Sequence, residues 1–389
     1  MTTPRFTKAA NAGSKKPVKA FLLGAILVAA VAGAGCGGSA SGSAENAKLP
    51  EQALQSDLNQ MVDEGVPGGI LLVREGDEEV TIAGGKADVE SGEAMNAGLR
   101  YRIGSETKSM VSTVVFQLAE EGALALDQSV DHWLPGLVGY GKDVTIRDLL
   151  NHSSGIPDYL ASDKPLAPYI AGDFDHIWTP KQLIGIALER PQAFKAGSKV
   201  SYSNTNYTLL GLIIEKATAN ALGRELESRI FEPIGLDDTS FPTSPAIEGP
   251  HSHGYLKSPG SKDLDVTGVS PSVYFGAGSV ISSASDMADF YDALLDGELL
   301  SEESLAEMKT VNEEHGDLGM AAGLMRNKTE CGSSWGHDGA VPGYDSVAFR
   351  TDDGRTVIAM ANSLTFDDQV GSAKAQAAWT RMINDAICA

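Results

Sequence analysis

Residues 104–108 read Gly-Ser-Glu-Thr-Lys. An apolar series with helical spacing follows them: Met110, Val111, Val114, Val115, Phe116 and Leu118. This series predicts a buried helix that begins near Ser105. Ser105 and Lys108 are three residues apart, so a helix brings both side chains to one face and within reach of each other. Free backbone N–H groups and the helix dipole at the helix start favour negative charge on the serine oxygen. The pair is therefore a candidate nucleophile and base.

The S-x-x-K pattern needs support, because a serine with a solvated lysine on a first helical turn is an equally ordinary interpretation. A serine hydroxyl attacks only when a base takes its proton, and the pKa of lysine, about 10.4, must fall for lysine to do so. Two later stretches supply partners, Tyr202-Ser203-Asn204 and His337-Asp338-Gly339. The Tyr202 phenol is a second possible base. The Asn204 amide can hold a substrate carbonyl or position Lys108.

The remaining pattern predicts an α/β (α+β) fold. Strand-like segments lie near both ends of the chain, at residues 69–74, 80–83, 346–349 and 356–360, and helical patterns dominate the middle. We therefore expect an antiparallel sheet made from the N- and C-terminal parts and flanked by helices, with an inserted, mostly helical domain. The approximate bounds are 51–120 plus 276–389 for the α/β part and 121–275 for the insertion.

The first 35 residues are typical of an export signal. A basic stretch precedes the apolar run 20–31, which is short for a membrane span of about 20 residues. Residues 32–34 fit ordinary signal cleavage, whereas residues 34–36 resemble a bacterial lipoprotein box that would lipidate Cys36, although Gly33 replaces the usual Leu. The Gly/Ser-rich run 37–44 favours the lipoprotein, since it suits a flexible tether. We predict a signal peptide at 1–35, a flexible linker at 36–50 and a folded domain at 51–389. The protein would be lipid-anchored at the outer face of the bacterial cell membrane, or otherwise secreted.

Charge and cysteine content narrow the possible partners. The chain has a formal net charge of −22, and without its first 35 residues it retains 25 basic and 52 acidic side chains. Such a polyanion repels nucleic acid and anionic lipid, so we expect no nucleic acid partner and membrane contact only through the lipid anchor. We expect a monomer without cofactor or metal, since no Cys or His set has structural-zinc spacing. In an exported protein the remaining Cys331 and Cys388 are expected to form a disulfide.

The three motifs S-x-x-K, Y-x-N and H-x-G, in this order and at these wide intervals, resemble the signature of the serine β-lactamase/D-alanyl-D-alanine carboxypeptidase superfamily. The similarity is to the branch with class C β-lactamases, secreted DD-carboxypeptidases and esterases. It runs from about residue 50 to the C-terminus and includes 149–155, 202–207, 231–239 and 276–283. The resemblance implies a β-lactamase/transpeptidase-like fold in which Ser105 is acylated.

The same resemblance assigns roles to the other motif residues. It implies that Lys108 and Tyr202 share proton transfer, with Tyr202 preferred as the base. Asn204, His337 and Gly339 would bind substrate. The N–H groups of Ser105 and Ala340 would form the oxyanion hole, which is worth about 2.7–4 kcal/mol per donor in known cases.

Departures from the carboxypeptidase pattern affect specificity. Those enzymes have Thr on both sides of the H-x-G glycine, where this chain has Asp338 and Ala340. They also have Arg after a Gly-Leu pair, where this chain has Met325. Arg326, one place later, would point to the other face of a strand, so we rank it last among the substrate-binding candidates. Asp338 would oppose a substrate carboxylate by about 1–4 kcal/mol at 4 Å.

The resemblance therefore implies a serine hydrolase that acts on a small peptide, ester or β-lactam. A D-alanyl-D-alanine carboxypeptidase-like activity is the first expectation, and a β-lactamase or esterase of the same family is the alternative. A catalytically weak penicillin- or peptidoglycan-binding surface protein is the alternative from another class.

Two further signals are interpreted as structural. Residues 332–336 match G-x-S-x-G, a nucleophile motif that needs a helix after it, but Gly339, Pro342 and Gly343 follow. His152 stands at the end of a short helical pattern beside a Ser/Gly turn, where histidine more often has a structural than a catalytic role.

Overall fold

The computed structural model describes residues 50–257, 263–363 and 372–389. The predicted signal peptide, Cys36 and all but the last residue of the predicted linker lie outside these ranges. Within them, no helix combines the length and apolar character needed to span a membrane.

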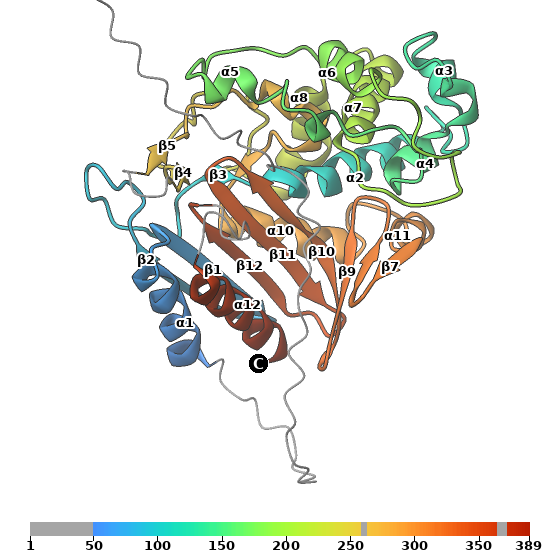
Figure 1. Ribbon diagram of the computed structural model, residues 1–389. Helices are drawn as coiled ribbons and strands as arrows, with labels where there is room; N and C mark the ends of the chain where they lie inside the picture. Colours follow the sequence, from blue (N-terminus) through green and yellow to red (C-terminus); the bar gives the residue numbers. More distant parts are fainter. Residues whose placement is uncertain (1–49, 258–262, 364–371) are drawn as a thin grey trace, which may run out of the picture.

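An antiparallel sheet organises the molecule (Figure 1). Its strand order is β2-β1-β12-β11-β10-β9-β8-β7, so the N-terminal hairpin lies against the C-terminal strand β12. The expected sheet from both ends of the chain is confirmed. The strands are β1 (Gly68–Glu75), β2 (Glu78–Gly85), β3 (Tyr101–Arg102), β4 (Tyr255–Leu256), β5 (Leu264–Asp265), β6 (Ile281–Ser282), β7 (Glu313–His315), β8 (Leu318–Met320), β9 (Met325–Thr329), β10 (Gly332–Val341), β11 (Tyr344–Thr351) and β12 (Thr356–Ala361).

The sequence pattern did not predict strands β7, β8 and β10, whereas the resemblance implied a strand at Arg326, where β9 lies. β7 and β8 have three residues each, and β10 contains Gly332, Gly336 and Gly339, which lower its strand propensity. As a result His337-Asp338-Gly339 lies inside β10, whereas the sequence pattern placed it before a loop and strand. The G-x-S-x-G stretch is also part of β10, and a turn and β11 follow it rather than a helix.

Helices cover both faces of the sheet and fill the region above it in Figure 1. α1 and α12 pack side by side on one face, and α10 packs on the other. The helices are α1 (Glu51–Asp63), α2 (Thr107–Glu120), α3 (Val130–Trp133), α4 (Ile146–Leu150), α5 (Ala167–Ile170), α6 (Pro180–Ala187), α7 (Asn204–Thr218), α8 (Leu222–Leu226), α9 (Glu232–Ile234), α10 (Ala284–Leu295), α11 (Glu302–Met308) and α12 (Ala373–Cys388). Residues 121–275 therefore contribute helices α3 to α9.

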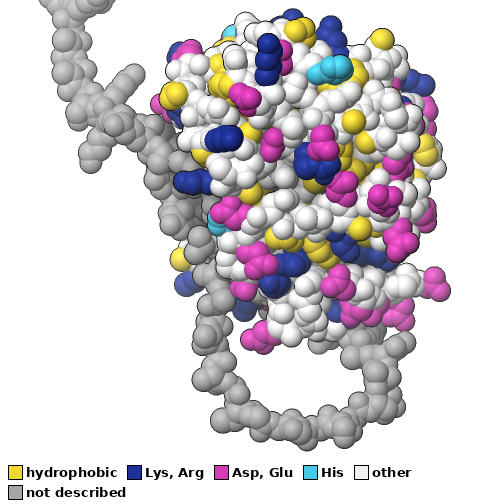
Figure 2. Space-filling view, turned by 90° about the vertical axis from the view of Figure 1, so that its right-hand side faces the viewer, with side chains coloured by type: hydrophobic (Ala, Val, Ile, Leu, Met, Phe, Trp, Pro, Cys, Tyr) yellow, Lys and Arg dark blue, Asp and Glu magenta, His cyan; other side chains and the backbone are white. Residues whose placement is uncertain are grey.

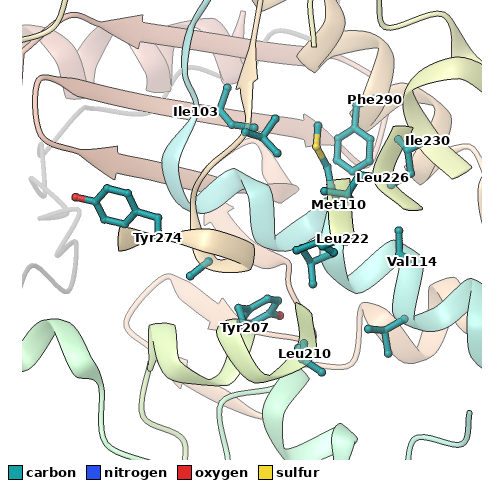
Figure 3. Close-up of a cluster of buried hydrophobic side chains, with 14 of the residues drawn as sticks. Ile103, Met110, Val114, Tyr207, Leu210, Leu222, Leu226, Ile230, Tyr274 and Phe290 are labelled. Carbon is teal, nitrogen blue, oxygen red and sulfur yellow. The ribbon is translucent and has the colours of Figure 1, made fainter. Parts of the chain in front are cut away.

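The main core joins the sheet to the helical region. Buried side chains of β1 and β12 belong to the same apolar cluster as those of α2, α7 and α10. Figure 3 shows part of this cluster, where Met110 and Val114 of α2 lie among Leu222, Leu226 and Phe290. A second cluster lies between α1, α12 and the other sheet face. α2 is thus held on several sides by apolar contacts, which fixes the position of the serine at its start.

Acidic and basic side chains are mixed on the surface of the molecule. On the face drawn in Figure 2, Asp and Glu side chains are spread over the surface with Lys and Arg among them.

A disulfide joins Cys331 and Cys388, with Cα atoms 5.5 Å apart. It connects the turn between β9 and β10 to the last turn of α12, and so ties the end of the chain to the strand that carries the H-x-G motif.

Candidate active site

Ser105 lies in a single 3-10 turn, Gly104–Glu106, directly before α2. Glycines let β10 pass against this turn. A Cβ on Gly104, whose φ is +55°, would lie 2.8 Å from the Ala340 nitrogen. A Cβ on Gly339 would lie 1.9 Å from the Ile103 carbonyl oxygen, an impossible contact. The H-x-G glycine is therefore needed for close packing, and it brings the Ala340 backbone beside the nucleophile turn.

Lys108 is completely buried and has three partners. Its Nζ lies 2.9 Å from Ser105 Oγ, 2.9 Å from Asn204 Oδ1 and 2.6 Å from the Ala277 carbonyl oxygen. The last two are pure acceptors, so each takes one N–H of the amine. In the neutral amine the lone pair then points at Ser105. The geometry gives Lys108 a position from which it can receive the serine proton.

Tyr202 contacts the serine from another side. Its hydroxyl donates to Ser105 Oγ at 2.8 Å, and Lys108 Nζ lies 4.9 Å from its ring centroid. Burial lowers the pKa of Lys108 to about 7. Burial, and after it the Asp338 charge, raises the pKa of Tyr202 well above its usual value. These directions favour Lys108 as the base and Tyr202 as a neutral phenol, the reverse of the preference implied by the resemblance.

Asn204 is the first residue of α7. Its Oδ1 accepts from Lys108, and its Nδ2 donates to Asp158 Oδ2 at 3.0 Å. Both ends of the amide are thus engaged inside the protein. Asn204 therefore positions Lys108 here, and its grip on a substrate carbonyl stays a prediction. Burial raises the pKa of the Asp158 carboxyl.

The β10 side of the site is more exposed. The His337 ring lies 6.4 Å from the Tyr202 ring, and its Nδ1 is 3.2 Å from Asp338 Oδ1. The Asp338 side chain is 19% exposed, and Ala340 is exposed. Oxyanion stabilisation by the Ser105 and Ala340 N–H groups stays a prediction, although the backbones of Gly104 and Ala340 are in contact.

Arg326 does not join this group. Its guanidinium pairs with Glu314 and lies 6.0 Å from the Trp335 ring centroid. Register pairs Arg326 with Trp335 and Met325 with Gly336, so Arg326 and Met325 alternate between the two faces of the sheet. Met325 packs in the second apolar cluster, of which Tyr202 is a neighbour.

Sequence reasoning missed two contributors, the Ala277 carbonyl and Asp158, and it interpreted His152 as structural. The first two touch the Lys108–Asn204 pair, and the His152 ring packs on Tyr202 with centroids 4.5 Å apart. The only available signal was the similarity of the stretches 149–155 and 276–283 to the family. Among the described residues, no group of three His, Cys, Asp or Glu side chains converges in a way that could hold a metal ion.

Comparisons with known proteins agree with this geometry. The Beta-lactamase family profile matches residues 52–378. Penicillin-binding protein 4* of Bacillus subtilis is 29% identical over 315 residues, which are 76% of this chain and 68% of that protein. The structure of a D-stereospecific amidohydrolase from Streptomyces sp. is 35% identical, with a TM-score of 0.77 over 84% of this chain and 98% of that chain.

A D-amino acid amidase from Ochrobactrum anthropi SV3, solved with L-phenylalanine amide, is also similar. It is 27% identical, with a TM-score of 0.77 over 86% of this chain and 97% of that one. The family profile covers most of the described residues, and the similar structures have the same sheet-and-helix architecture. The chain therefore belongs to the β-lactamase family of serine hydrolases.

Proposed function

We propose that this protein hydrolyses an amide bond that follows a D-configured residue, through an acyl-enzyme on Ser105. The observation that carries the proposal is the contact of Ser105 Oγ with both Lys108 Nζ and the Tyr202 hydroxyl. The D-configuration is supported by the names of the similar solved structures, a D-stereospecific amidohydrolase and a D-amino acid amidase.

The bonded network suggests a sequence of proton transfers. Ser105 Oγ attacks the carbonyl carbon, and its proton moves to the lone pair of neutral Lys108. The oxyanion that forms is held by the Ser105 and Ala340 N–H groups. The C–N bond breaks while Tyr202 passes a proton to the leaving nitrogen and recovers one from Lys108. Water then attacks the Ser105 ester and gives a proton to Lys108. The bond between the carbonyl carbon and Ser105 Oγ breaks, Oγ takes that proton from Lys108, and the carboxylic acid product leaves.

Asp338 favours a leaving group without a carboxylate. It stands beside the H-x-G glycine, and its charge is near enough to Tyr202 and Lys108 to shift the pKa of both. The other differing positions, Met325 and Ala340, bring no positive charge, and Arg326 is engaged by Glu314. Ammonia or a neutral amine therefore suits this side better than free D-alanine. The second candidate is a D-alanyl-D-alanine carboxypeptidase, supported by a putative D-alanyl-D-alanine carboxypeptidase of Escherichia coli that is 29% identical over 209 residues, 49% of this chain.

A panel of substrates tests the proposal on residues 45–389. The panel holds D- and L-phenylalanine amide, an acylated D-alanyl-D-alanine, the same peptide as its C-terminal amide, a chromogenic cephalosporin and a p-nitrophenyl ester. We expect faster hydrolysis of the D-amide than of the L-amide, and of the peptide amide than of the peptide acid. Faster release of D-alanine from the acid would replace the amidase proposal with the carboxypeptidase, and cleavage of the ester alone would indicate an esterase.

We also propose export with lipidation of Cys36. The support is the order of basic stretch, apolar run and Cys36 in the sequence. Expression of the full chain and of Cys36→Ser in a bacterial host, followed by fractionation and mass spectrometry, tests it. We expect the full chain in the membrane fraction with a lipid adduct at Cys36, and the variant outside that fraction. An unmodified Cys36 in a cleaved, secreted protein would support the simpler signal peptide.

A further inference from the structure

The segment 201–203, which carries Tyr202 into the site, lies outside regular secondary structure just before α7. His152 holds it at two points. The His152 carbonyl accepts a hydrogen bond from the Ser201 N–H at 2.9 Å, and its ring Nδ1 accepts one from the Ser203 N–H at 3.2 Å. The two bonds flank Tyr202 on both sides along the chain.

The His152 side chain also touches the phenol itself. Its ring centroid lies 4.5 Å from that of Tyr202 and 5.3 Å from that of Tyr207, and the residue is 1% exposed. The backbone of His152 has φ of +60°, a conformation that residues other than glycine adopt seldom and at a cost. Such strain persists where the surroundings determine the conformation. One residue thus supports Tyr202 through its carbonyl, its ring nitrogen and its ring face.

The protonation state of the ring follows from its neighbours. Asn206 Oδ1 accepts from the Ser154 hydroxyl at 2.7 Å, so its Nδ2 is the atom that donates to His152 Nδ1 at 3.2 Å. With N–H groups of Ser203 and Asn206 pointing at it, Nδ1 carries no proton. Burial, and after it the charges of Lys108 and His337, hold the pKa of His152 well below its usual value. The imidazole is therefore neutral, with its proton on Nε2, and Nδ1 acts as an acceptor.

We propose that His152 is the positioning residue for Tyr202, and that its Nδ1 keeps the phenol hydroxyl at hydrogen-bond distance from Ser105. The inference rests on the proposed function to the extent that Tyr202 takes part in acylation. It differs from the prediction of a purely structural His152, because it assigns the residue an effect on the chemical step. A displacement of about 1 Å in a reacting group can cost on the order of 10²-fold in rate.

Two substitutions distinguish the acceptor role of His152 Nδ1 from the contact of its ring with Tyr202. His152→Phe keeps an aromatic ring beside Tyr202 and removes the acceptor. His152→Asn removes the ring, but its Oδ1 can occupy the place of Nδ1, and asparagine tolerates positive φ. Ser153→Ala is the matched control, since the Ser153 hydroxyl bonds Asp148 at 2.8 Å and Asn151 at 2.6 Å and supports the same loop.

We expect about a 10²-fold loss of kcat in His152→Phe with little change in KM, and recovery to within about tenfold of wild type in His152→Asn. Ser153→Ala should lower the melting temperature and leave kcat within about threefold. An equal loss of kcat in Ser153→Ala, or no recovery in His152→Asn, overturns the proposal.

A second measurement does not depend on turnover. Crystal structures of wild type, His152→Phe and Ser153→Ala report the distance from the Tyr202 hydroxyl to Ser105 Oγ, which is 2.8 Å here. We expect it to lengthen beyond hydrogen-bond range in His152→Phe alone, and an unchanged distance in that variant overturns the proposal. Absence of any acyl-enzyme in wild type would instead count against the proposed function and leave this distance test in force.

Discussion

The two sides of Ser105 are built differently. On the helical side, Lys108 is fully buried and Asn204 nearly so, and each of their polar groups has a partner. On the β10 side, Asp338 and Ala340 reach solvent, and both depart from the carboxypeptidase pattern. A dry, fully bonded network fixes the geometry of the proton-transfer groups, whereas a solvent-facing edge can change without breaking those hydrogen bonds. From this difference, and on the proposed function, we expect the helical side to determine the reaction and the β10 side the choice of leaving group.

The largest expected effect is that of Ser105→Ala. Both sides converge on this hydroxyl, so its removal should lower kcat/KM by at least about 10³-fold for every substrate the wild type cleaves. Steady-state assays measure the loss, and mass spectrometry after brief exposure to substrate should show an acyl adduct in wild type and none in the variant. Comparable turnover in Ser105→Ala would show that Ser105 is not the nucleophile.

The buried Lys108 should determine how kcat/KM depends on pH. Lys108, with a pKa of about 7, accepts the serine proton only when neutral, so kcat/KM should rise with pH through about 7 and fall roughly tenfold per unit below it. Initial rates from pH 5 to 11 measure this limb and any later rise. A profile that is flat across pH 7 and rises only near 10 would point to Tyr202 as the base.

Asp158→Asn tests the assignment of Lys108 as the base. The Asp158 charge raises the pKa of Lys108, so its removal should move the acid limb to lower pH. The asparagine can still accept from Asn204, which keeps the geometry largely intact. Glu298→Gln, a change of the same charge at an exposed site, is the control and should leave the limb in place. If the acid limb does not move in Asp158→Asn, the Asp158 charge does not influence the pKa of Lys108.

The sheet and the nucleophile followed from sequence because both depend on local patterns. Strand-like runs at 69–74, 80–83, 346–349 and 356–360 predicted the sheet, and S-x-x-K on a buried helix predicted the serine. Long-range contacts had no such signal. His152 and Asp158 meet Tyr202 and Asn204 only because the fold brings residues about 50 positions apart together. The choice between Lys108 and Tyr202 as the base depends on which acceptors surround Lys108 Nζ. One of them is the Ala277 backbone carbonyl, and no sequence motif identifies a backbone carbonyl.

The β10 side is tested by Asp338→Thr. The substitution removes a carboxylate and restores the hydroxyl of the carboxypeptidase pattern, so the ratio of rates for peptide acid to peptide amide should rise about tenfold. The acid limb of the pH profile should also move to lower pH, because the Asp338 charge, like that of Asp158, raises the pKa of Lys108. Glu298→Gln again controls for net charge. An equal rise for acid and amide would show that Asp338 affects the chemistry rather than the leaving group.

The smallest effect on catalysis is expected from the disulfide. Cys331 and Cys388 are 57 residues apart, and loss of a bridge of this span typically costs about 2–4 kcal/mol of unfolding free energy. The bridge ends at the turn that leads into β10, so loosening it should raise KM and weaken the discrimination between peptide acid and peptide amide. It does not touch Lys108, so kcat and its pH limb should stay within about threefold. Paired Cys331→Ser and Cys388→Ser substitutions, followed by denaturant titration and kinetics on the folded protein, measure both. A shifted pH limb in this variant would show that the two sides of Ser105 are mechanically joined through β10 and are not independent.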